Sequence, residues 1–135
     1  MKEEIIKDGE NLIAKICRNS DWPENLNFYT ADTDFVQVST WNYNKDKHLK
    51  AHGHKIAERK SNRTQEVIFV KSGKLKVVFY SEDDKQLYNG IMEPGDFAII
   101  FAGGHAYDIL KDKTQILEIK NGPYLGLEVD KKVIE

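Results

Sequence analysis

Residues 48–80 read HLKAHGHKIAERKSNRTQEVIFVKSGKLKVVFY, and this stretch decides which fold to expect. His52 and His54 are separated by one residue, so on an extended strand their side chains project to the same side. Glu66 opens an apolar run that ends at Gly73. Two imidazoles beside a carboxylate form a donor set that first-row transition metals prefer. The stretch therefore predicts a β scaffold that holds the three side chains together.

The chain around this stretch is typical of an all-β domain. Short segments rich in apolar, aromatic and β-branched residues recur at intervals of about ten residues and are bounded by turn signals, as in a sandwich or barrel. Alternation over 35–43 predicts a further strand, and a strand over 48–56 would carry the histidines. In the first 20 residues, Asp8-Gly9 interrupts an alternating pattern and favours a β-hairpin over a helix. The strands predicted after the histidines span 66–70, 75–80, 86–92, 97–101, 105–110 and 114–120.

Length and composition are those of one globular domain. The chain has 135 residues, 31% of them charged, and a formal net charge of −2. We expect N-terminal strands over 1–30 to pack on, or extend, a β-barrel domain over 31–135. The near-neutral charge disfavours nucleic-acid binding, which needs a basic surface. The longest apolar run, 97–102, is too short to cross a membrane, and the acidic start is unlike a secretory signal. With Cys17 as the sole cysteine, we expect a cytoplasmic location.

Two motifs in the chain resemble those of the cupin superfamily. The first is His52-Gly53-His54 followed by Glu66, six residues and Gly73, and the second is Gly95-Asp96, a strand and Gly103-Gly104-His105. The resemblance covers roughly residues 35–124. It implies a single-domain jelly roll, also called a double-stranded β-helix, to which the N-terminal hairpin is a short extension.

Within that superfamily the chain is similar to small single-domain bacterial cupins. The shared features are a Thr-Gln-Glu start at 64–66, the Gly-Gly-His turn and a Gly-Pro-Tyr ending at 122–124. No firm reaction belongs to that group as a whole. The resemblance also implies a homodimer, with the N-terminal hairpin covering a sheet edge across the interface.

The metal site that the resemblance implies contains His52, His54, Glu66 and, as a possible fourth ligand, His105. Such a site would take divalent iron, manganese, nickel or zinc. Eleven residues (55–65) separate His54 from Glu66, where the family has three or four. Glu58 lies at the family spacing and is the rival carboxylate, but a strand and a glycine follow only Glu66. The second motif is one residue short and lacks its proline.

Residues 45–63 contain seven Lys or Arg against two acids. One interpretation is a positively charged entrance to the site that attracts an anionic small molecule, with Arg59 and Arg63 as the residues best suited to bind it. The other is a solvated loop whose charges pair with the acidic turn at 82–84. Gln37 and Trp41 are further candidates for substrate binding.

Tyr107 shares strand parity with His105 and is the candidate catalytic residue. These residues lead to the hypothesis of a small metalloenzyme, of the isomerase, epimerase or dioxygenase type. The alternative is a non-catalytic module that binds or senses a small molecule, because one fold serves many functions. In a third interpretation, the histidines are structural and the jelly roll is inert.

Overall fold

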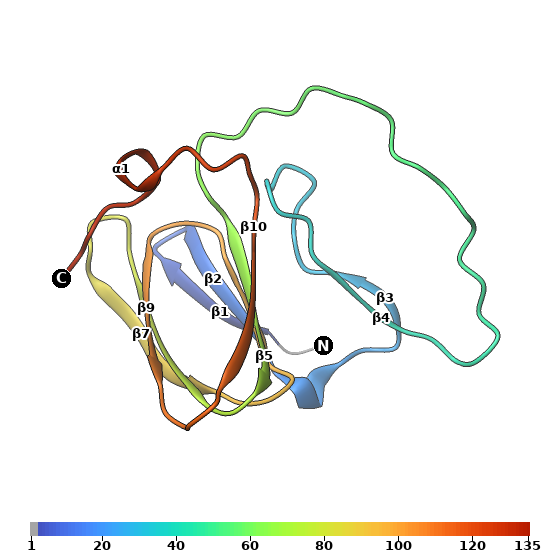
Figure 1. The fold of residues 1–135 in the computed structure, drawn as a ribbon, viewed down its shortest axis with the longest axis horizontal. Coiled ribbons are helices and arrows are strands. Elements are labelled where there is room, and N and C mark those ends of the chain that lie inside the picture. The colour runs from blue at the N-terminus through green and yellow to red at the C-terminus, as the bar shows by residue number, and fades with distance from the viewer. Residues whose placement is uncertain (1–2) are drawn as a thin grey trace.

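The structure is a computed structural model that describes residues 3–135 (Figure 1). It confirms the prediction of an all-β chain with antiparallel strand pairing. The helical elements are one 3₁₀ turn, Asn19–Asp21, and the short helix α1, Leu127–Asp130. None of the helices among the described residues is long and apolar enough to cross a membrane. The strands are β1 (Glu3–Asp8), β2 (Asn11–Cys17), β3 (Asn25–Phe28), β4 (Ser39–Asn42), β5 (Glu66–Ser72), β6 (Leu75–Tyr80), β7 (Gln86–Met92), β8 (Phe97–Ile100), β9 (Gly104–Ile109) and β10 (Gln115–Lys120).

Two sheets pack face to face around the main core. One sheet has five strands in the order β1-β2-β8-β5-β10, and the other has three in the order β7-β6-β9. Ile68 and Val70 of the larger sheet and Val77 and Phe79 of the smaller one are buried in the same apolar cluster. The sheets do not close into a barrel, so the expected β-barrel is corrected to an open sandwich. In Figure 1, β9 lies in the layer with β7, β10 lies in the layer with β5, and the chain between β9 and β10 crosses from one layer to the other.

The continuous apolar run of β5 reflects burial on both faces of the larger sheet. Its inner face meets the smaller sheet, and its outer face carries Val67 in a second buried cluster with Phe97 and Ile99. Tyr29 and Val36, which lie between β3 and β4, complete that second cluster. A strand covered on both sides reads as an unbroken apolar segment rather than an alternating one.

The predicted N-terminal hairpin is present. β1 and β2 pair antiparallel, and the turn between them has Gly9 at φ 61°. β2 in turn pairs with β8, so the hairpin adds two strands to the larger sheet and is not a separate layer.

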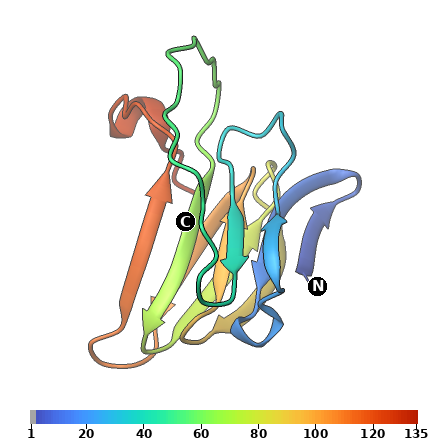
Figure 2. The same cartoon turned by 90° about the vertical axis from the view of Figure 1, so that its right-hand side faces the viewer.

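The prediction of a strand over 48–56 is wrong. Residues 43–65 contain no strand or helix, and the strand expected over 35–43 is reduced to β4. Figures 1 and 2 show this segment as a long arc that stands away from the sheets. Nearly all of its side chains are exposed, so no apolar face is available to dock a strand against the core.

Candidate functional site

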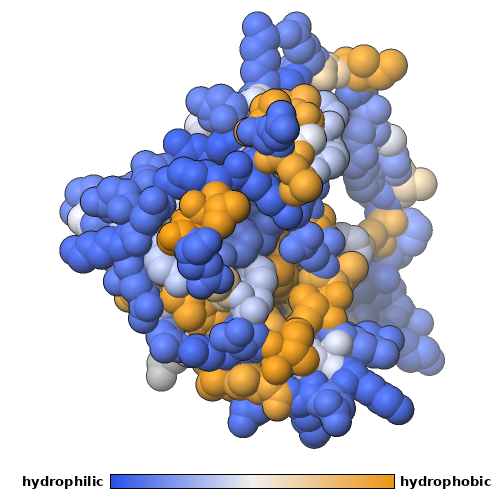
Figure 3. Space-filling model, turned by 60° about the vertical axis from the view of Figure 1, so that its left-hand side comes forward, coloured by the Kyte–Doolittle hydropathy of each residue, from blue (hydrophilic) through white to orange (hydrophobic). Residues whose placement is uncertain are grey.

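A cavity of about 300 Å³ lies between the sheets, next to β9 and β10. β9 is an edge strand of the smaller sheet and β10 is an edge strand of the larger one. No ladder joins these two strands, so the sandwich has an open side here, which we call the β9–β10 seam. Figure 3 shows apolar patches among the hydrophilic residues on the side that carries β9. The cavity is lined by Ile68, Leu75, Tyr107, Ile109, Ile116 and Glu118.

A polar cluster of three side chains lies beside this cavity. Tyr107 donates a hydrogen bond to the Oε1 atom of Glu66 at 3.0 Å. The Nε2 atom of His105 lies 3.1 Å from the same oxygen. The rings of His105 and Tyr107 stack with their centroids 4.9 Å apart. This arrangement confirms the parity prediction that the two rings share one side of their strand.

Strand register explains why these residues meet. In β9, His105 pairs with Phe79 and Tyr107 with Val77, both of which are fully buried residues of β6. Residues that are paired across a sheet point to the same face, so both rings point into the sandwich. Glu66 begins β5 and points inward from the opposite sheet, with 4% of its surface exposed.

The environment keeps Tyr107 protonated. Burial, followed by the negative charge of Glu66 and the hydrogen bond to it, raises the pKa of Tyr107 far above its usual value. Tyr107 is therefore a donor to the carboxylate, and its own oxygen still has lone pairs for another group. A contact between His105 Nε2 and a carboxylate favours the tautomer with the hydrogen on Nε2. Among residues 3–135, the buried Nδ1 atom of His105 has no hydrogen-bond partner.

Glu118 and Lys120 lie next to each other on the inner face of β10. Glu118 pairs with Ile68 and Lys120 pairs with Glu66 in the β10–β5 ladder. The Lys120 ammonium lies 3.1 Å from Glu118 Oε1, and this hydrogen bond raises the pKa of Lys120. Both side chains are more than a third exposed, so the pair stays hydrated at the rim of the cavity.

The structure does not bring the predicted metal ligands together. His52 and His54 are exposed on the 43–65 segment, with ring centroids 5.3 Å apart, while Glu66 and His105 are inside the sandwich. No group of three or more His, Cys, Asp or Glu side chains within 3–135 is arranged to hold a metal ion. The predicted ligand set does not fit a metal as it stands, and metal binding stays a prediction.

The two candidate carboxylates lie in different surroundings. Glu58 is 79% exposed and its Oε1 lies 3.6 Å from Lys60 Nζ, whereas Glu66 is buried against His105. Of the two, only Glu66 faces the interior.

The candidate substrate-binding residues lie outside the cavity. Arg63 forms a 2.9 Å ion pair with Glu82, as the solvated-loop interpretation expects, and Arg59 donates to the carbonyl of Ala57 at 3.3 Å. Gln37 donates to the carbonyls of the 31–34 turn, and the Trp41 side chain is 59% exposed. Their assignment to substrate stays a prediction.

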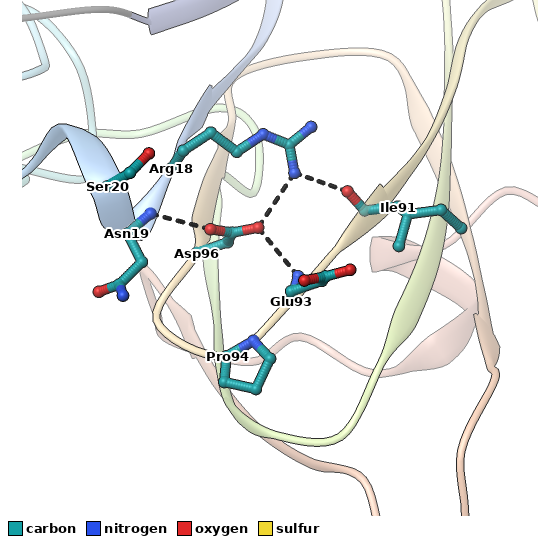
Figure 4. Close-up of a pocket in the computed structure, with 7 residues that line it drawn as sticks. All are labelled: Arg18, Asn19, Ser20, Ile91, Glu93, Pro94 and Asp96. Atoms are coloured by element: carbon teal, nitrogen blue, oxygen red, sulfur yellow. Dashed lines mark hydrogen bonds and ion pairs between the residues drawn. The ribbon is translucent and has the colours of Figure 1, made fainter.

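The opposite side of the sandwich is closed by an ionic cluster around Arg18. Its guanidinium contacts the carbonyl of Ile91 at 2.6 Å and Asp96 at 3.0 Å (Figure 4), and it also contacts Glu4 at 2.6 Å. These contacts tie β1 and β2 to β7 and to the turn before β8. Burial by itself would lower the pKa of Arg18, but the hydrogen bonds with Glu4 and Asp96 raise it. A depression of about 430 Å³ lies beside this cluster, and the charged side chains that line it include Arg18 and Asp96, which are already paired with each other. We therefore interpret this cluster as structural.

Asp96 stabilises the turn before β8. It accepts backbone hydrogen bonds from Asn19 at 2.8 Å and Glu93 at 2.9 Å, as acidic side chains commonly do in turns. Its partner Arg18 was missed, because nothing in the sequence links two residues separated by 78 positions.

The apolar cavity residues and Glu118 were also missed as site residues. Ile116 and Glu118 are separated by one residue on a predicted strand, so parity places them on one side of it. Which side faces the core depends on how the strands of the two sheets are ordered, and local sequence does not contain that order.

No protein-family model, curated protein or solved structure matches this chain.

Proposed function

We propose that this protein is a small-molecule-binding module with a jelly-roll-like, cupin-like scaffold, and that its ligand occupies the cavity at the β9–β10 seam. The observation that carries the proposal is an apolar cavity at the β9–β10 seam, beside the buried Glu66 carboxylate and its partners Tyr107 and His105. This is the non-catalytic alternative of the sequence analysis.

The size and lining of the cavity support binding of a small molecule. Its volume of about 300 Å³ is at the lower end of the range for ligand sites, roughly 300–1,000 Å³. Four aliphatic side chains and one tyrosine ring provide apolar contact, and Glu118 and the Tyr107 hydroxyl provide points of orientation. Small-molecule sites usually have this composition, with a few polar groups on an apolar wall.

The contrast between the two sides of the sandwich supports the same entrance. On the far side, contacts of Arg18 with Glu4, the carbonyl of Ile91 and Asp96 tie β1 and β2 to β7 and to the turn before β8. At the β9–β10 seam, Ile109 keeps 60% of its surface exposed although it lines the cavity. An exposed aliphatic residue at the rim of a cavity offers apolar area that a ligand can cover.

The metalloenzyme hypothesis stays a prediction, as do the anionic substrate, the homodimer and the cytoplasmic location. An activity would need a reacting group beside the ligand, and the cluster offers Tyr107 and His105 as the nearest candidates. Tyr107, with its raised pKa, is suited to donate a hydrogen bond and is a poor base.

The test is to fill the cavity and measure the loss of binding. The neutral fluorescent probe prodan is titrated into the protein, into Ile116→Trp and into Leu117→Trp. Ile116 lines the cavity, while Leu117 is the next residue of β10, is 54% exposed and points outward, which makes it a matched control. We expect saturable, blue-shifted emission for the wild type and Leu117→Trp, and at least about tenfold weaker binding to Ile116→Trp, because an indole occupies the space. Equal binding to all three proteins would contradict the proposal.

A further inference from the structure

We propose that the ligand of the β9–β10 cavity is a small amphipathic amine, with an apolar body in the cavity and an ammonium group at its polar end. This inference rests on the proposed function and specifies the class of ligand. It differs from the anionic molecule expected from the basic 45–63 segment, whose residues do not line the cavity.

The polar groups that line the cavity accept hydrogen bonds. Tyr107 uses its single proton in the bond to Glu66, which leaves its oxygen as an acceptor. Glu118, the other polar residue of the lining, has no hydrogen to donate when it is ionised and then acts only as an acceptor. Among ligands with the same apolar body, this lining therefore favours one that provides donors at its polar end.

The buried carboxylate strengthens the acceptor at Tyr107. A hydroxyl that donates to a carboxylate has a more negative oxygen, because hydrogen bonds in a chain polarise one another. Glu66 is 4% exposed, so water screens its charge weakly. The field at the Tyr107 oxygen thus favours a positively charged donor over a neutral one.

The charged side chains near the cavity also favour a positively charged ligand. The carboxylates of Glu66 and Glu118 both contribute to raising the pKa of Tyr107. One cation, Lys120, lies beside them, at 3.1 Å from Glu118 and outside the cavity lining. Glu66, Glu118 and Lys120 together leave one excess negative charge beside the cavity, which an ammonium would balance.

The apolar part of the cavity determines the other half of the ligand. Ile68, Leu75, Ile109 and Ile116 have no polar side-chain atoms, and Leu75 is only 2% exposed. A compact alicyclic or aromatic body of six to ten carbon atoms suits a volume of about 300 Å³.

The experiment compares three molecules that share one body: cyclohexylmethylamine, cyclohexylmethanol and cyclohexanecarboxylate. Binding of each to the full chain at pH 7 is measured by calorimetry. A charge-assisted hydrogen bond predicts that the amine binds roughly tenfold more tightly than the alcohol, and the carboxylate least tightly. Glu118→Gln should weaken the binding of the amine about twofold to fivefold, a modest loss because Glu118 is partly exposed. The substitution should leave the affinity for the alcohol unchanged.

The control is Glu93→Gln, which makes the same change of charge on the opposite side of the sandwich. It should leave the affinity for the amine unchanged. If the alcohol or the carboxylate binds as tightly as the amine, the amine inference is overturned while the binding function stands. If none of the three binds, and prodan does not distinguish Ile116→Trp from the wild type, the proposed function itself has failed.

Discussion

Glu66 is the residue on which the interior of the site depends. Removing an ionised carboxylate from water into a protein interior costs on the order of several kcal/mol, even after the protein relaxes around it. Hydrogen bonds and opposite charges must replace the lost hydration. Tyr107 donates to its Oε1 atom, and His105 lies 3.1 Å from the same atom. Both partners are on β9, so the carboxylate of one sheet holds the edge strand of the other.

We predict that Tyr107→Phe lowers the free energy of unfolding at neutral pH, and that this free energy then falls less with rising alkaline pH than it does in the wild type. The phenol has a pKa that folding raises above the usual 10.0, so its contribution is complete below pH 10 and is lost as the pH rises through the folded-state value. The variant should unfold about 1–2 kcal/mol more easily at pH 7. Between pH 10 and 11, its free energy of unfolding should fall by up to about 1 kcal/mol less than that of the wild type.

Urea unfolding at pH 7, 10 and 11 measures both effects. Tyr124→Phe is the control, because Tyr124 is 68% exposed and lies in the C-terminal segment. Tyr29 and Tyr88, whose pKa values burial also raises, remain in every variant and contribute equally to each comparison. Equal slopes with pH for Tyr107→Phe and the wild type would contradict the account of Tyr107.

Much of this residue-scale picture could be predicted from the sequence. Strand parity predicts that His105 and Tyr107 share one side of their strand, and the strand that follows Glu66 favours it over Glu58 as the carboxylate. The convergence of His52 and His54 with Glu66 was also expected from parity, but parity has meaning only on a strand. His52 and His54 lie in a segment that forms no strand, and no local feature of the sequence showed that the strand would be absent.

At the scale of the element, the turn before β9 aims the cluster into the sandwich. Gly103 has φ 71°, and a Cβ added there would lie 2.1 Å from the carbonyl oxygen of Tyr80. The turn therefore needs glycine for its backbone conformation and also for space. β9 begins directly after it, with His105 as its second residue.

We predict that Gly103→Ala is far more destabilising than Gly9→Ala. Gly9, in the β1–β2 turn, has a similar φ of 61°, but a Cβ there would meet nothing within 4 Å. Gly9→Ala should cost about 1 kcal/mol, the penalty for a left-handed backbone. Gly103→Ala adds a clash with a backbone atom and should cost about 3 kcal/mol or more.

The free energies of unfolding in urea give the comparison directly. If the two substitutions cost the same, the backbone contact at Gly103 is not a constraint on the turn. A second readout is the binding of prodan, which should weaken in Gly103→Ala and be unchanged in Gly9→Ala.

The elements themselves were predictable where apolar runs alternate with turn signals. The strands expected over 75–80 and 86–92 match β6 and β7 residue for residue, and the four others from 66 onward differ by one or two residues at their ends. The 43–65 segment was not predictable in the same way. Its start continues a short alternating pattern, but strand formation needs a partner edge, and the sheet edges are determined by the order of the other strands.

At the scale of the whole molecule, the sandwich has one closed and one open side. Arg18 binds Glu4 of β1, and it also binds the Ile91 carbonyl of β7 and Asp96 (Figure 4), while β9 and β10 remain unpaired with each other. The C-terminal segment lies across one end, where Lys132 pairs with Asp84 at 2.8 Å. This asymmetry directs a ligand to one entrance.

The most direct test of this account is where a small ligand binds. Amide chemical shifts of the full, ¹⁵N-labelled chain are followed while cyclohexylmethylamine is added. We predict saturable changes at Ile68, Tyr107, Ile109 and Ile116, and unchanged signals at Arg18, Asn19 and Ile91 on the closed side. Changes centred on the closed side or spread over the 43–65 segment, with the residues of the β9–β10 cavity unaffected, would contradict it.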